Sequence, residues 1–158
     1  MRKILTALVV VALLTTTILC VACQSFEGTA FEALDQLADE GKIEMDYTGV
    51  PGTGVYLTKV SYDGLTMEND YINGKYICLY IKSTNEENYL NDPFMGSYEF
   101  KGKHYEASNA IDKIVYEKGM KLLIVYTTFN SATNQYVPAA GDALLFTLPN
   151  KVEKVTLD

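Results

Sequence analysis

Four kinds of side chain in this 158-residue sequence could take part in chemistry: one histidine, three cysteines, grouped carboxylates and twelve tyrosines. Nucleophilic catalysis needs a base held within hydrogen-bonding distance of the nucleophile. His104 lies in Lys103-His104-Tyr105-Glu106, whose alternation is typical of an exposed hairpin strand. The sequence also lacks the Gly-x-Ser-x-Gly, Ser-x-x-Lys and His-Glu-x-x-His motifs. We therefore expect no catalytic residue and interpret the chain as a protein without enzymatic activity.

The carboxylates fall into two acidic stretches that could offer oxygen ligands to calcium or the acid and base of a glycosidase. One stretch holds Glu86, Glu87 and Asp92, and the other holds Asp63, Glu68 and Asp70. Neither follows a known ligand spacing, and solvated acidic loops are common in a chain of net charge −7. We expect neither a metal site nor a cofactor. The same acidic balance excludes nucleic acid as a partner, because binding phosphates requires a basic surface.

Tyrosine is abundant, and several tyrosines fall on expected strands. The candidates for ligand binding are Tyr76, Tyr80 and Tyr126. Flat aromatic faces on a sheet could stack on sugar rings or form a protein interface. Tyrosine is also a favoured strand residue, and the absence of tryptophan weakens a carbohydrate assignment. Both interpretations of the three tyrosines stay open at this point.

The N-terminal residues have the composition of an export signal. Arg2 and Lys3 precede the uncharged and mostly apolar residues 4–22. The following sequence Leu19-Cys20-Val21-Ala22-Cys23 resembles the lipobox of bacterial lipoproteins, although Cys20 stands where that family usually has leucine. The resemblance implies that Cys23 carries a lipid and that the domain is exported and anchored on the outer side of the cell membrane. Conventional cleavage and a retained membrane span over residues 4–22 are the alternatives.

Removal of residues 1–22 would leave a more acidic chain with few thiols. The net charge would change from −7 to −9, and Cys78 would be the only cysteine that is not lipidated. Cys78 lies in the apolar run Lys75–Ile81, where a cysteine behaves as a small hydrophobic residue. We expect a buried, unreactive thiol and no disulfide bond within the chain.

The elements that would position these residues are one helix and several strands. Thr29 and Glu32 form a capping box, and Gly41 supplies a stop, so a short amphipathic helix is expected over residues 30–40. Its apolar face is expected to dock on the sheet of its own domain. Period-two runs predict strands at 54–62, 76–83, 97–100, 104–107, 122–129, 143–148 and 151–157. The longest irregular stretches, residues 85–95 and 130–141, are where contacts with a partner are expected.

The order of these strands resembles the immunoglobulin-like domains of Gram-positive surface lipoproteins over residues 54–158. The chain keeps Asn85, Gly102-Lys103 and Lys118-Gly119 of that pattern. The resemblance implies a mainly β fold, an antiparallel immunoglobulin-like β-sandwich, and transfers no site residue. We expect a signal peptide over 1–22, a lipid-anchor tether with the short helix over 23–45, and the sandwich domain over 46–158.

The expected function is that of a cell-envelope lipoprotein that acts as a non-enzymatic binding or scaffold module. Its expected partners are the membrane, reached through the N-terminal lipid, and an envelope protein or glycan. The alternative is a carbohydrate-binding or small-ligand-binding domain that uses surface tyrosines.

Overall fold

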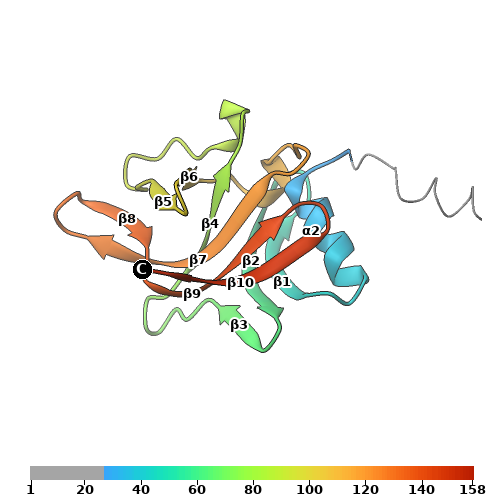
Figure 1. Ribbon diagram of the computed structural model, residues 1–158, viewed down its shortest axis with the longest axis horizontal. Helices are drawn as coiled ribbons and strands as arrows, with labels where there is room; N and C mark the ends of the chain where they lie inside the picture. Colours follow the sequence, from blue (N-terminus) through green and yellow to red (C-terminus); the bar gives the residue numbers. More distant parts are fainter. Residues whose placement is uncertain (1–26) are drawn as a thin grey trace, which may run out of the picture.

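The computed structural model describes residues 27–158, which form one α-helix, two short 3-10 helices and ten β-strands (Figure 1). The expected signal peptide and Cys23 lie outside these residues. Within residues 27–158, no helix has the length and apolar character needed to cross a membrane. The fold is mainly β, with antiparallel sheets and a single α-helix, as the strand pattern predicts.

Helix α2 (Ala30–Asp39) begins where the capping box places it. The Thr29 hydroxyl accepts from the Glu32 amide at 3.3 Å, and the Thr29 amide donates to Glu32 at 2.7 Å. Gly41 ends the helix with a φ of +68°, which favours glycine. The buried face holds Phe31, Leu34 and Leu37, which join the main hydrophobic core together with residues of both sheets. The expected docking of the helix on its own domain is confirmed.

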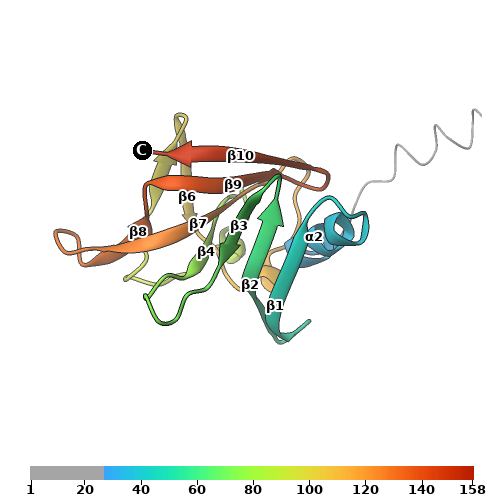
Figure 2. The same cartoon turned by 90° about the horizontal axis from the view of Figure 1, so that it is seen from below.

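A small antiparallel sheet lies beside the helix and contains β1 (Glu44–Val50), β2 (Gly54–Tyr62) and β3 (Leu65–Glu68) in that order (Figure 2). The turn between β1 and β2 is held by the carboxylate of Asp112. This carboxylate accepts from the amides of Gly52, Gly54 and Val55 at 2.8, 3.1 and 2.7 Å. The turn therefore depends on a residue far along the chain.

The large sheet contains the remaining strands, which are β4 (Ile77–Lys82), β5 (Tyr98–Phe100), β6 (Lys103–Ala107), β7 (Lys121–Asn130), β8 (Gln135–Pro138), β9 (Gly141–Thr147) and β10 (Lys151–Leu157). The order is β10-β9-β7-β4-β6-β5, and β8 pairs with the end of β7. The period-two runs at 76–83 and 122–129 predict β4 and β7, which lie at the centre of this sheet. The β7–β8 hairpin extends away from α2, at the opposite end of the molecule (Figure 1).

The expectation of an irregular stretch over residues 130–141 is wrong, because Gln135–Pro138 forms β8. Its four residues pair with Thr127–Asn130 in a hairpin whose turn contains Asn134 at a φ of +58°. A short strand that includes a proline has little period-two signal. Pairing with an already formed long strand, rather than local propensity, therefore stabilises this segment.

Two core clusters occupy the two faces of the central strands. The main core lies against α2 and the small sheet and includes Ile81, Leu122 and Ile124. The second cluster includes Tyr80, Leu123 and Val125, and all its buried members come from strands of the large sheet. The large sheet is therefore curved, and its own strands bury the face that does not contact α2 and the small sheet. Among residues 27–158, the buried core residues extend from Ala30 to Leu157.

Candidate functional site

The three candidate tyrosines do not share one surface. Tyr80 has no exposed surface, and its hydroxyl donates to the Tyr136 carbonyl at 3.4 Å. Burial raises the pKa of Tyr80, and Cys78 adds to this effect. The expectation that Tyr80 offers a ring at the surface is not met, because the curved sheet encloses it in the second cluster.

Tyr126 and Tyr76 lie close together, since Tyr126 pairs with Ile77, but their rings have different partners. Tyr126 packs against the main core, on the face of the sheet opposite Tyr80. Its hydroxyl accepts from the Glu68 amide at 2.8 Å and donates to the Glu68 carbonyl at 3.0 Å, which links β7 to the end of β3. Tyr76 is 44% exposed and contacts Tyr71 edge to face at 5.8 Å between ring centroids. The three rings therefore form no common stacking platform.

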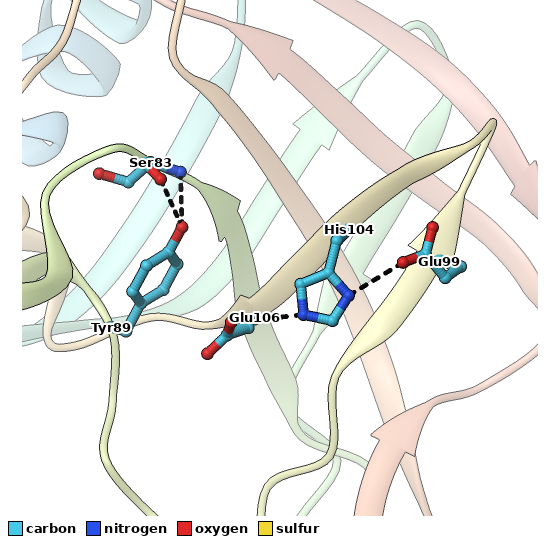
Figure 3. Close-up of polar contacts among 5 residues, drawn as sticks. All are labelled: Ser83, Tyr89, Glu99, His104 and Glu106. Atoms are coloured by element: carbon cyan, nitrogen blue, oxygen red, sulfur yellow. Dashed lines mark hydrogen bonds and ion pairs between the residues drawn. The ribbon is translucent and has the colours of Figure 1, made fainter.

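His104 stands between two carboxylates on the exposed side of the β5–β6 hairpin (Figure 3). Its Nδ1 lies 2.9 Å from Glu99 and its Nε2 lies 3.3 Å from Glu106. With both ring nitrogens next to carboxylates, the imidazole has no hydroxyl or thiol partner to activate. This arrangement lacks the nucleophile and base pair of a hydrolase.

The acidic stretches do not converge on a common point. Within residues 27–158, no group of three or more histidine, cysteine or acidic residues could hold a metal ion. Asp70 instead accepts from the amides of Ile72 and Asn73, each at 3.1 Å, and organises its own turn. Its role in the structure is that of a turn residue.

The loop that follows β4 is held rigidly by two polar side chains. The Glu117 carboxylate accepts from the amides of Thr84 and Asn85, each at 3.0 Å, and from the Ser83 hydroxyl. Asn88, in the 3-10 helix η1 (Glu86–Asn88), is fully buried and exchanges two hydrogen bonds with the backbone of Val115. Tyr89 adds a contact, because its hydroxyl donates to the Ser83 carbonyl at 2.6 Å (Figure 3). These contacts fix the segment that leads into residues 90–95.

A cavity of about 190 Å³ lies beside this segment, between β2 and the edge of β4, and we call it the inter-sheet pocket. It forms where strand pairing stops. β6 pairs with β4 at Tyr80 and Ile81, and β3 pairs with β2 over Lys59–Tyr62, so neither covers the pocket end of its neighbour. Its apolar lining includes Val55, Leu57, Ile77, Leu79, Ala110 and Ile111, with Tyr56, Leu90 and Met95 also contributing.

The polar groups of the inter-sheet pocket are few and uncharged. None of its lining residues carries a charge. Half-buried Cys78 lies 3.6 Å from the Thr127 hydroxyl, and burial raises the pKa of its thiol. The hydroxyl oxygen of Ser108 is buried and has no hydrogen-bond partner among residues 27–158. This composition suits binding of an uncharged apolar group, since a charge would have no partner there.

The sequence analysis singled out some of the residues that line the inter-sheet pocket. Leu90 and Met95 lie in the stretch 85–95, which was expected to make contacts, whereas Cys78 was expected to be simply buried. Tyr56, Ser108 and Ala110 carry no local signal, because the pocket depends on where pairing between distant strands ends.

A scan against protein-family models finds no match for the chain, and searches of curated proteins and of solved structures find none either.

Proposed function

We propose that this chain is a cell-envelope lipoprotein whose domain acts as a non-enzymatic binding module for small apolar groups. In this proposal residues 1–22 are a signal peptide and Cys23 carries the lipid that anchors the domain outside the cytoplasm. The domain is an antiparallel sandwich related to immunoglobulin-like domains. The sequence before residue 27 supports the anchor, and two antiparallel sheets around one main core support the fold.

The observation that carries the binding role is the uncharged apolar inter-sheet pocket. An apolar cavity of about 150 Å³ accommodates benzene, so a cavity of about 190 Å³ has room for a chain or ring of about six carbons. Each methylene transferred from water contributes about 0.8 kcal/mol. A six-carbon group therefore supplies several kcal/mol, from which the entropy lost on association must be subtracted.

The absence of activated groups at the pocket supports binding without catalysis. The Cys78 thiol has Thr127 as its hydrogen-bond partner, and its raised pKa leaves little thiolate near neutral pH. His104, the only histidine, is held by Glu99 and Glu106 instead.

The test uses residues 24–158, which contain all the buried core residues of the described part of the chain and retain Cys78 as the only thiol. Binding of 1-hexanol to the folded state should raise the midpoint of thermal unfolding. Ser108→Leu enlarges a side chain of the pocket lining, and Ser108→Ala is the matched control. We expect the stabilisation in the wild type and in Ser108→Ala, and its loss in Ser108→Leu. Equal responses of all three proteins would contradict the proposal.

A protein partner is a second candidate, favoured by one exposed hairpin. Ile72 is 96% exposed at a turn closed by two hydrogen bonds between Asp70 and Lys75, and Tyr71 and Tyr76 stand beside it. A rigid apolar tip of this kind is a favourable anchor for a partner protein. Crosslinking of the tagged full-length protein in intact cells should capture a discrete partner that Ile72→Ser loses. Capture that is unaffected by Ile72→Ser would exclude this hairpin as the contact.

A further inference from the structure

A second, polar cavity adjoins the inter-sheet pocket, and we call it the head pocket. It measures about 320 Å³ and shares Leu90, Met95 and Ala107 with the inter-sheet pocket. The two cavities are therefore neighbours, and two of the three shared residues, Leu90 and Met95, have long, rotatable side chains. A molecule with an apolar end and a polar end could occupy both.

The polar side of the head pocket is rich in hydrogen-bond acceptors. Among the residues that line it, Glu106 is the one carboxylate, and His104 directs both of its ring nitrogens at the carboxylates of Glu106 and Glu99. The Gln135 side-chain nitrogen donates to the Pro93 carbonyl at 3.2 Å, which leaves its side-chain oxygen as an acceptor. The Ser97 hydroxyl can also accept. The lining therefore favours a ligand group that donates hydrogen bonds.

The electrostatics favour a positive charge on that group. Glu106 is about half exposed, and its neighbour His104 also contacts Glu99, so two carboxylates flank one imidazole (Figure 3). The whole chain carries a net charge of −7, which adds a long-range attraction for cations. A carboxylate ligand would meet like charge. A sugar would find no tyrosine, tryptophan or phenylalanine among the residues that line the head pocket, only the imidazole of His104.

We propose that the two cavities together bind a small apolar amine. Its alkyl chain or ring of about six carbons fills the inter-sheet pocket, and its primary ammonium group donates to Glu106 in the head pocket. This inference rests on the proposed function, because the inter-sheet pocket supplies the apolar contacts. The inference adds that the ligand carries a positive charge and donates hydrogen bonds.

The test compares hexylamine, 1-hexanol and hexanoate, which share one chain and differ in the head group. NMR titrations of residues 24–158 at one fixed pH and low salt give the three dissociation constants. We expect hexylamine to bind about threefold more tightly than 1-hexanol, because a partly exposed ion pair contributes a ratio of about that size. Hexanoate should bind most weakly of the three.

Two matched variants test whether the preference for hexylamine over 1-hexanol depends on Glu106. Glu106→Gln and Glu99→Gln each remove one carboxylate next to His104, but only Glu106 lines the head pocket. We expect Glu106→Gln to make hexylamine and 1-hexanol equal in affinity and Glu99→Gln to keep most of the preference. Equal affinities in the wild type, or equal losses in both variants, would overturn the inference and leave the apolar pocket standing. Failure of all three ligands to bind would overturn the proposed function as well.

Discussion

Ser108 has a polar atom to which no described residue makes a hydrogen bond. Its hydroxyl oxygen is buried without a hydrogen-bond partner, and leaving such a group unpaired costs about 1–3 kcal/mol. Ser108→Ala removes this cost, and the backbone amide of residue 108 can still donate to the Leu79 carbonyl. We expect the free energy of unfolding to stay level or rise by about 1 kcal/mol, measured by urea denaturation. A loss of more than about 1 kcal/mol would mean that this hydroxyl has a partner.

Cys78 gives a second prediction at the same scale. Burial raises the pKa of its thiol, and the thiolate is the form that reacts. We expect a thiol reagent to leave Cys78 of folded residues 24–158 essentially unmodified and to label it quickly in urea. Rapid labelling of the folded protein would show that the inter-sheet pocket opens far more widely than its walls indicate.

At the scale of elements, Asp112 connects the 3-10 helix η2 (Ile111–Lys113) to the turn between β1 and β2. Burial acts to raise the pKa of Asp112, but the amides of Val55, Gly52 and Gly54 outweigh it and hold the pKa below its ordinary value. In Glu117 the effect of burial is likewise outweighed by the donors from residues 83–85, and its pKa is also lowered.

These two lowered pKa values predict how stability depends on pH. A carboxyl group with a lowered pKa in the folded state contributes stability above its unfolded pKa of about 4, and this contribution is lost as pH falls through the folded value. We expect unfolding free energies to fall below about pH 4 and Asp112→Asn to flatten that dependence. Urea denaturation over a pH series measures both. An unchanged slope in the variant would contradict the role of Asp112.

The elements also show what the sequence could predict. The bounds of β2 and β10 agree with the period-two runs, and α2 begins at its capping box, because these signals are local. β8 was missed, since its pairing with β7 stabilises a segment with weak strand propensity. Tyr80 stayed a candidate for ligand binding, because alternation shows which face a residue occupies but not that the sheet curves over that face.

The inter-sheet pocket was missed for a related reason. It exists because β6 leaves β4 after two residue pairs and because β3 covers only the end of β2. Register and the length of a pairing depend on contacts between distant segments, which a single sequence does not display. The apolar stretch around Cys78 indicated burial in general and could not distinguish a filled core from the wall of a cavity.

At the scale of the whole molecule, the proposed anchor gives a prediction about location. Cys23→Ala should abolish metabolic labelling with a radioactive fatty acid and release the domain from the membrane fraction, because the proposed lipid is attached to that sulfur. Cys20→Ala is the matched control and should keep the label. Labelling that persists in Cys23→Ala would contradict the anchor.

The central claim is that this protein binds its small apolar ligand in the inter-sheet pocket. The most direct measurement is a map of amide NMR shifts as 1-hexanol is added to residues 24–158. We predict saturable shifts that are largest at Leu57, Cys78 and Ser108 and that disappear in Ser108→Leu. Shifts that do not saturate, or that centre on the hairpin of Tyr71 and Ile72, would contradict the claim.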